Sequence, residues 1–264
     1  MKNKILSRLP ASYPWRGNIH YFDTIDSTNT EAKRMAADGA PHGTVLIADC
    51  QTHGRGRMGR SFHSPENAGI YLSMILRPNC PAQQLLHLTC ATAVAAADGI
   101  YRATSLQTGI KWTNDLVYER KKLGGILTEL ALNSNGSVDY AIVGIGINCN
   151  QTALQFPTEI QSTATSLRLC TGKDIDRTAV IASILVALQE MCSNLQNPAK
   201  ILARYKEKCI TIGQDISLLR GDVVSHGKAL DVDDNGALLV RFEDGQIHTV
   251  NSGEVSIRGM YGYV

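Results

Sequence analysis

Glycines alternate with arginines over residues 54–60, which read GRGRMGR. The string contains the G-x-G-x-x-G spacing of dinucleotide-binding folds, but Pro65 stands where that motif continues as a helix, and no acidic residue follows about 20 positions on to hold a ribose. Glycines let a backbone come close to an anion, and guanidinium groups bind carboxylate or phosphate through paired hydrogen bonds. We therefore predict a mobile loop that binds an anionic ligand; the alternative is an ordinary solvated basic loop.

Lysines and an asparagine form a second group of candidate residues. The strings KWTNDL, from Lys111 to Leu116, and KKLGGIL, from Lys121 to Leu127, read as the two sides of a hairpin. A lysine that points from such a hairpin into a pocket stabilises charge that develops on a phosphoryl or acyl oxygen. Taken alone, Lys121 and Lys122 are also compatible with a solvated turn.

A third group is the string GIGIN at residues 144–148, which places glycines inside an apolar strand. Glycine weakens a strand interior unless something has to approach the backbone closely. The sequence shows no Ser-His-Asp or Cys-His arrangement and no zinc-binding motif. The chemistry expected of these three groups is therefore positioning and charge stabilisation, without a covalent nucleophile.

Composition narrows the class of protein. Hydrophobic residues make up 44% of the chain and charged residues 19%, as in ordinary globular domains, and the net charge of +2 gives no sign of nucleic-acid binding. The seven cysteines are scattered without a C-x-x-C pair, which favours free thiols in a reducing compartment. Because a run of about 18 apolar residues and the apolar core of a secretory signal are both missing from the sequence, we expect a cytoplasmic protein with no membrane partner.

These residues need elements to position them, and the hydrophobic pattern predicts an α+β chain. A capping pattern over Thr28–Glu31 predicts a helix that ends at about Asp38. Short apolar runs predict strands, and longer periodic or alanine-rich runs predict helices. The predicted strands are 44–49, 70–76, 109–112, 116–118, 125–132 and 140–147, and the further helices are 83–103, 177–195 and 198–210.

The pattern changes at Gly213. Beyond it, Asn235-Gly236 and Asp244-Gly245 are strong hairpin signals. Residues 213–264 carry a formal charge of −4, and residues 1–212 carry +6. We predict two domains with these boundaries, the second a small acidic β-barrel.

Together the motifs resemble the biotin–protein ligase family in identity, order and spacing. The resemblance runs through STN at residues 27–29, Gln51 ahead of GRGRMGR, then KWTNDL, KKLGGIL and GIGIN, and it spans roughly residues 20 to 258. The strings GALL at 236–239 and GEVSIR at 253–258 resemble the small SH3-like domain of that family. The resemblance implies a class II synthetase-like catalytic domain, with a mixed, largely antiparallel sheet packed with helices, followed by an SH3-like β-barrel.

The resemblance also implies an activity. Biotin would be joined to AMP from ATP, with Mg²⁺, to give biotinyl-5'-AMP, and then passed to a lysine of a biotin carboxyl carrier protein. About 20 residues precede the matched region, too few for a three-helix DNA-binding domain, so we expect a stand-alone form with no DNA partner. A monomer or weak homodimer is expected.

Residue roles follow from the same resemblance. The residues expected to be catalytic are Arg57, Lys111 and Lys122. Those expected to bind biotin are Ser27, Thr28, Asn29, Gln51, Arg55, Gly56, Arg57, Lys122 and Gly125. Those expected to bind ATP or the adenylate are Arg57, Phe62, Lys111, Asn114, Lys122 and Asn148. The sequence does not identify the ligands of the metal.

Two positions depart from the family pattern, and three other functions stay open. Phe62 stands where the family often has tryptophan, and Thr113 stands where it usually has proline, so we expect a smaller aromatic cover and a looser turn before Asn114. The alternatives are a lipoate or octanoyl ligase or transferase on a related fold, a DNA-binding repressor, and a non-catalytic biotin-binding or interaction module. The polar residues 27–29 with Gln51 favour biotin over an apolar acyl chain.

Overall fold

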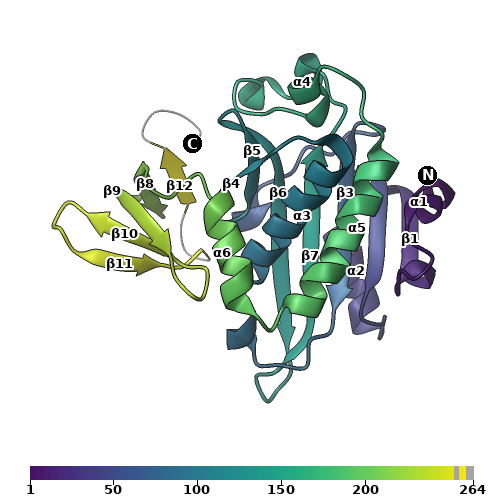
Figure 1. The fold of residues 1–264 in the computed structure, drawn as a ribbon, viewed down its shortest axis with the longest axis horizontal. Coiled ribbons are helices and arrows are strands. Elements are labelled where there is room, and N and C mark those ends of the chain that lie inside the picture. The colour runs from purple at the N-terminus through teal and green to yellow at the C-terminus, as the bar shows by residue number, and fades with distance from the viewer. Residues whose placement is uncertain (253–255, 260–264) are drawn as a thin grey trace.

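The structure, a computed structural model, describes residues 1–252 in full and the backbone of residues 256–259. Its main feature is a seven-stranded sheet packed with helices, and a separate five-stranded sheet lies towards the C-terminus (Figure 1). The strands of the larger sheet are, in spatial order, β1 (Ile19–Ile25), β2 (Thr44–Gln51), β3 (Gly69–Leu76), β7 (Val138–Asn148), β6 (Lys121–Leu132), β5 (Asp115–Tyr118) and β4 (Gly109–Lys111).

The larger sheet is mixed, because β1 and β2 run parallel while its other neighbours run antiparallel. The prediction of an α+β fold with a largely antiparallel sheet is therefore confirmed. All six predicted strands of this region exist, although β6 begins at Lys121 and not at Gly125. Strand β1 was not predicted, since its sequence IHYFDTI is mostly half-exposed and carries no clear apolar alternation.

Six α-helices accompany the two sheets in the described part of the chain. The prediction of one helix over 83–103 is wrong at its start: residues Ala82–Leu85 form a 3-10 turn, and the α-helix begins at Leu88. The N-terminal residue of that helix, His87, makes no side-chain capping bond, so the alanine-rich sequence carried no mark of where the helix starts. The helices are α1 (Lys2–Arg8), α2 (Thr28–Ala37), α3 (Leu88–Thr104), α4 (Leu167–Thr171), α5 (Arg177–Asn194) and α6 (Pro198–Lys208).

Side-chain caps explain where the other predicted helices begin. The carboxylate of Asp176 accepts hydrogen bonds from the first-turn amides of α5, and Asn197 caps α6 ahead of Pro198. Helix α2 is capped by the hydroxyl of Ser27, one residue before the predicted capping position at Thr28. The helices predicted near residues 28, 177 and 198 are confirmed.

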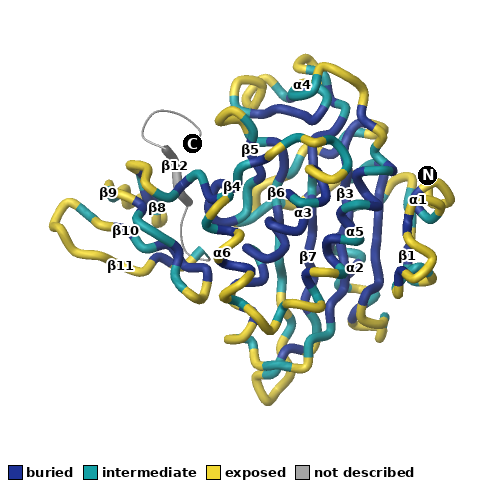
Figure 2. Tube along the Cα trace, viewed as in Figure 1, coloured by how far each residue is buried: buried dark blue, intermediate teal, exposed yellow. Residues whose placement is uncertain are grey.

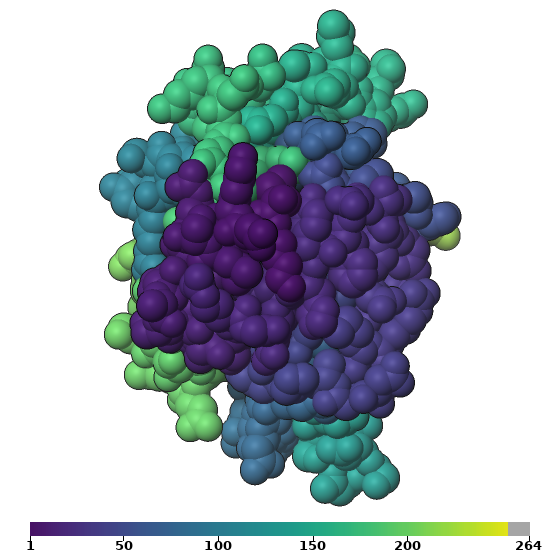
Figure 3. Space-filling view, turned by 90° about the vertical axis from the view of Figure 1, so that its right-hand side faces the viewer, coloured from purple at the N-terminus to yellow at the C-terminus, as the bar shows by residue number. Residues whose placement is uncertain are grey.

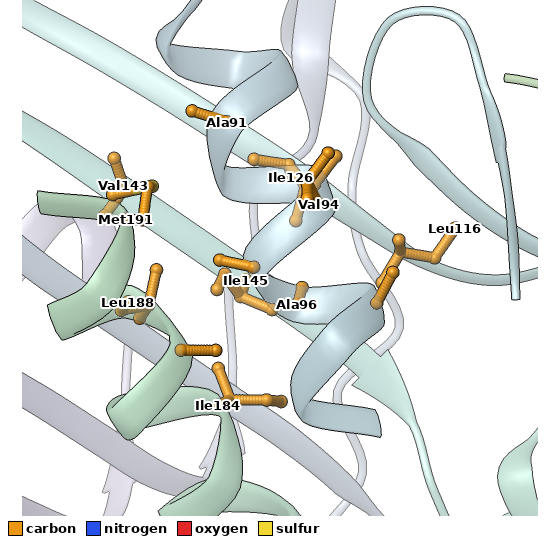
Figure 4. Close-up of a cluster of buried hydrophobic side chains, with 14 of the residues drawn as sticks. Ala91, Val94, Ala96, Leu116, Ile126, Val143, Ile145, Ile184, Leu188 and Met191 are labelled. Carbon is orange, nitrogen blue, oxygen red and sulfur yellow. The ribbon is translucent and has the colours of Figure 1, made fainter. Parts of the chain in front are cut away.

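Helices cover both faces of the larger sheet. In Figure 1, α3 and α5 lie side by side in front of the strands, and Figure 4 shows Val94, Ile184 and Leu188 facing Val143 and Ile145 of β7. On the other face, the alanines of α2 pack on residues of β2, β3 and β7. The buried residues therefore lie mainly in the middle of the sheet and in the helices that pack on it (Figure 2).

The smaller sheet is antiparallel and lies beyond β4 and α6 (Figure 1). Its spatial order is β11 (Ile247–Val250), β10 (Leu238–Phe242), β9 (Val223–Val232), β8 (Asp215–Arg220) and β12 (Ser256–Gly259). At the opposite end, β1 forms the edge of the larger sheet, and the N-terminal part of the chain faces the viewer on that side in Figure 3. Among the described helices, none is both long enough and apolar enough to cross a membrane.

Candidate active site

A small pocket of about 40 Å³ lies on the face of the larger sheet that α2 covers. Its floor lies where β6 and β7 place Gly125 opposite Gly146 and Leu127 opposite Gly144. Glycine leaves the backbone of a strand uncovered, so a flat ring can lie directly on these strands. This gives the glycines of GIGIN and KKLGGIL a common purpose that their spacing alone did not show.

Two of these glycines are required by close contacts. A Cβ atom added to Gly144 would lie 2.0 Å from Oδ1 of Asn29, and one added to Gly146 would lie 2.7 Å from the ring of Phe62. The ring of Phe62 also makes an edge contact with Tyr71, at 6.3 Å between ring centres. Phe62 therefore lies at one side of the pocket, and its role as an aromatic cover on the ligand stays a prediction.

The polar wall of the pocket comes from the N-terminus of α2 and the end of β2. Ser27, Thr28 and Asn29 are each at most 5% exposed. The backbone amide of Thr28 donates to Oε1 of Gln51 at 2.8 Å, and its hydroxyl lies 3.1 Å from the same atom. Gln51 in turn donates to the hydroxyl of Ser64 at 2.9 Å. The structure thus brings together the four polar residues that the sequence analysis assigned to biotin.

A buried serine of β3, which the sequence analysis missed, supports this wall. The hydroxyl of Ser73 lies 2.8 Å from Oγ1 of Thr28 and 2.6 Å from Oδ1 of Asn29. The amide nitrogen of Asn29 donates to Glu129 at 2.9 Å and to the carbonyl of Leu127 at 3.3 Å. Both ends of the Asn29 amide are therefore held, which fixes the side presented to a ligand.

The arginine–glycine loop, residues 54–62, folds as a small hairpin beside the pocket. The amide of Gly56 donates to the carbonyl of Arg60 at 2.7 Å, and the amide of Phe62 donates to the carbonyl of Gly54 at 2.8 Å. At the tip, Met58 has a left-handed backbone with φ of 54°. This hairpin returns the chain over Gly146 and places Phe62 there.

The two arginines in the middle of GRGR have different surroundings. Arg55 is 3.2 Å from a carboxylate oxygen of Glu129, and it lines the pocket. Arg57 donates to Oδ1 of Asn114 at 2.8 Å and to the backbone carbonyl of Ser252. Burial lowers the pKa of Arg57 below its ordinary value, and the nearby carboxylate of Asp115 opposes that shift.

Lys122 pairs with Asp115 beside the pocket floor. Its ammonium nitrogen lies 2.7 Å from Oδ1 of Asp115, across the β5–β6 pair in which Asp115 stands opposite Gly125. A Cβ atom added to Gly125 would lie 3.6 Å from the Lys122 nitrogen and 3.4 Å from Asp115. Asp115 was not predicted as a site residue, although its place in KWTNDL, directly after Asn114, was a usable signal.

Lys111, assigned a catalytic role from sequence, is a buried residue of β4 with 6% of its surface exposed. It stands opposite Asp115 in the β4–β5 hairpin. The turn that follows is not loose, because the carbonyl of Thr113 accepts a hydrogen bond from the hydroxyl of Tyr205 at 3.1 Å and Thr113 is 3% exposed. Asn114 then donates to the carbonyl of Ile126 at 3.1 Å.

Asn148, at the end of β7, is buried and holds a neighbouring segment. Its amide nitrogen donates to the carbonyl of Thr165 at 3.0 Å. The amide of Lys122 donates to the carbonyl of Thr163 at 2.7 Å, and the amide of Thr165 donates to the carbonyl of Lys122 at 2.8 Å. Asn148 is therefore connected to Lys122 through residues 163–165.

The predicted residues thus fall into two groups. One group lines the wall and floor of the pocket. The other group does not belong to the pocket lining among the described residues; it consists of Gly56, Arg57, Lys111, Asn114, Lys122 and Asn148. Within residues 1–252 there is no cluster of three or more His, Cys, Asp or Glu side chains suited to a metal ion. The pocket members of the predicted set are Ser27, Thr28, Asn29, Gln51, Arg55, Phe62 and Gly125.

Comparison with protein families gives two matches. Residues 21–148 match the Biotin/lipoate A/B protein ligase family, and residues 211–258 match the Biotin protein ligase C terminal domain. The first match spans the polar wall, the arginine–glycine loop, Lys122 and the glycine floor.

Individual proteins resemble most of the chain. A bifunctional ligase/repressor BirA of Bacillus subtilis is 39% identical over 244 residues, which is 91% of this chain and 74% of that protein. A biotin–[acetyl-CoA-carboxylase] ligase of Mycobacterium tuberculosis is 33% identical over 252 residues, which is 93% of this chain and 90% of that protein. Among solved structures, a biotin protein ligase from Aquifex aeolicus in complex with biotin and ATP has a TM-score of 0.78 and 33% identity, covering 92% of this chain and 99% of that one.

Proposed function

Because this chain belongs to the biotin protein ligase family, we propose that it activates biotin with ATP and transfers it to a lysine of a biotin carboxyl carrier protein. The observation that carries the proposal is the pocket itself. A glycine floor, a wall of hydrogen-bonding side chains, and the cations Lys122 and Arg57 adjoin one another on one face of the sheet. That combination suits a flat polar ring that carries a carboxylate.

The ring end of biotin would occupy the wall. Its cyclic urea group needs both donors and acceptors, and Thr28, Asn29 and Gln51 provide hydroxyl and amide groups of both kinds. The fused rings would lie on Gly125 and Gly146, where strand backbone is uncovered. A site built with such polar groups favours biotin over an apolar lipoyl or octanoyl chain, because only a polar ring can form hydrogen bonds with them.

The carboxylate end would react near Lys122. A carboxylate oxygen attacks the α-phosphorus of ATP, the bond to pyrophosphate breaks, and a mixed anhydride with AMP remains. Lys122 and Arg57 would stabilise the negative charge on the carboxylate and phosphate oxygens during this step. In the second step the amine of the acceptor lysine attacks the carbonyl carbon, loses a proton as the amide forms, and expels AMP.

Lys111, Asn114 and Asn148 would act on the nucleotide side. Asn114 holds Arg57, and Asn148 holds the segment that pairs with Lys122, so both can act by placing the cations. We propose that Mg²⁺ arrives with the phosphates of ATP, because this ion keeps several waters and commonly needs only one or two protein carboxylates. Asp115, beside Lys122, is the carboxylate placed to serve it.

Exchange of labelled pyrophosphate into ATP tests the proposal. We expect exchange that depends on biotin and is not supported by lipoate or octanoate at the same concentration. Biotinylation of a purified carrier domain should then require ATP and stop when its acceptor lysine is replaced by arginine. Exchange driven equally well by octanoate would favour the acyl-ligase alternative, and binding of biotin without any exchange would favour a non-catalytic module.

A further inference from the structure

Glu129 of β6 is the centre of a charged cluster that includes two residues of the pocket lining, Asn29 and Arg55. Its carboxylate lies 2.5 Å from the ammonium group of Lys33, accepts a hydrogen bond from Asn29 at 2.9 Å, and lies 3.2 Å from a guanidinium nitrogen of Arg55. Burial raises the pKa of Glu129, but the hydrogen bonds from Lys33 and Asn29 and the charge of Arg55 outweigh it, so the pKa lies below its ordinary value. The side chain is 18% exposed, which leaves these contacts partly shielded from solvent.

The two arginines of the loop therefore differ in charge balance. The guanidinium of Arg55 is paired with a carboxylate, whereas the acceptors that Arg57 contacts within residues 1–252, Asn114 and the carbonyl of Ser252, are neutral. Asp115 lies near Arg57 but is paired with Lys122. An incoming phosphate gains more from a cation with neutral partners than from one already neutralised.

Because of the position of Arg55 in the hairpin, its contact with Glu129 restrains the rest of the loop. Arg55 bridges to Ser61 across the base of the loop, and the neighbouring pair joins Phe62 to Gly54. A contact that holds Arg55 against β6 therefore also holds Phe62 over Gly146, at the edge of the pocket.

We propose that Glu129 is a positioning residue that anchors the arginine–glycine loop through Arg55, while Arg57 keeps the role given to it above. The role of Arg55 then differs from the direct biotin contact that the sequence suggested. The inference deepens the proposed function, on which it rests for the identity of the ligand.

The rate of trypsin cleavage measures how firmly the loop is held, and it needs no substrate because the loop contains cleavage sites of its own. Cleavage after Arg57 and Arg60 would be followed by mass spectrometry in the full chain. We expect Glu129→Gln to accelerate it about threefold to fivefold, the scale of losing one partly exposed charge pair. The matched control is Glu190→Gln, which removes the partner of Arg102 on the outer surface of α5 and should leave the loop unchanged.

A double-mutant cycle separates the anchor from an effect through Asn29. Arg55→Gln should accelerate cleavage after Arg57 and Arg60 as much as Glu129→Gln, and the double variant should add little to either. Additive effects, or a Glu129→Gln loop as resistant as the parent, would overturn the proposal. Thermal melts of all variants identify any general loss of folding.

A binding measurement connects the anchor to the ligand. Both single variants should raise the KM for biotin about threefold to tenfold with a smaller change in kcat, since a loosened loop weakens retention more than charge stabilisation. A fall in kcat at constant KM would contradict the anchoring role. The protease result stands even if the chain proves inactive with biotin, so failure of the proposed function and failure of the anchor are distinguishable.

Discussion

The ammonium group of Lys122 and the carboxylate of Asp115 share one edge of the pocket, 2.7 Å apart and next to Gly125. An ion pair here can serve two purposes: it holds the lysine in one place before substrate arrives, and it leaves a cation beside the reacting carboxylate. Lys121, the neighbouring residue, is exposed at the start of β6. The local pattern alone left both lysines compatible with a solvated turn, and strand geometry separates them, because successive residues point to opposite faces.

Replacing this lysine gives the first prediction. Lys122→Ala should slow biotin-dependent pyrophosphate exchange at least about 100-fold, the scale of losing one preorganised charge contact in a site. Lys121→Ala is the matched control and should stay within about threefold of the parent, because a solvated charge contributes little. Exchange by Lys122→Ala at a rate close to the control, with both variants folded by their melts, would remove Lys122 from the chemistry.

The residue scale also shows what sequence alone could not supply. Ser27, Thr28 and Asn29 lie together because one helix start carries all three, so a single local pattern predicted them. Ser73 and Glu129 were missed because each lies inside an apolar strand. Each reaches the site only because the strand register pairs segments that are distant in the sequence. No spacing within the chain contains that information.

At the scale of elements, the strand pair β6–β7 does most to shape the site. Gly144 and Gly146 lie on the same face of β7, and the strand keeps its pairing on both sides despite them. The apolar runs predicted both strands, although only β7 is largely buried and β6 is mostly half-buried or exposed. Strand β1 was less visible because it lies at the edge of the sheet, where one side needs no apolar residues.

Replacing Gly144 or Gly146 by alanine tests whether the ligand lies on the glycine floor of the pocket. Gly144→Ala should raise the KM for biotin at least about tenfold, because its Cβ atom would meet the amide of Asn29, which hydrogen bonds hold at both ends. Gly146→Ala should have a smaller effect, since the ring of Phe62 can turn aside more easily.

Gly17→Ala provides the control for these two variants, because a Cβ atom there would meet nothing within 4 Å. It should leave both KM and stability near the parent values. An unchanged KM in Gly144→Ala would show that the ligand does not use this part of the strand pair.

At the scale of the whole molecule, the C-terminal region contacts both the KWTNDL motif and the arginine–glycine loop. The indole nitrogen of Trp112 donates to the carbonyl of Gly236 at 2.9 Å, and Arg57 donates to the carbonyl of Ser252. The string GEVSIR of the family resemblance ends at Arg258, whose side chain lies outside the described part of the chain. The partners in these two contacts are separated by 124 and 195 positions in the sequence. Such contacts result from packing and cannot be predicted from either local sequence.

These contacts argue that the C-terminal region, residues 213–264, is a working part and not a passive cover. Trp112 stands between Lys111 and Thr113 in the motif that we propose to act on the nucleotide, so the hydrogen bond that holds its indole also holds that motif. Lys206 of α6 and Asp231 of β9 add a third link, at 2.8 Å. A cap that merely covered apolar surface would need none of these polar contacts.

Trp112→Phe in the full chain is the last prediction, because it keeps the aromatic ring and removes the hydrogen bond. The buried carbonyl of Gly236 then loses its donor, at a cost of about 1–3 kcal/mol. We expect the KM for ATP to rise about fivefold or more while the Kd for biotin changes by less than about threefold, since the biotin wall lies on the far side of β5 and β6 from Gly236. Trp15→Phe, at the other tryptophan of the chain, should change neither value. A chain ending at Ile212, used only if it melts cooperatively, should likewise retain biotin but lose ATP use or transfer. Normal ATP use in both changed proteins would show that the C-terminal region only covers the larger sheet.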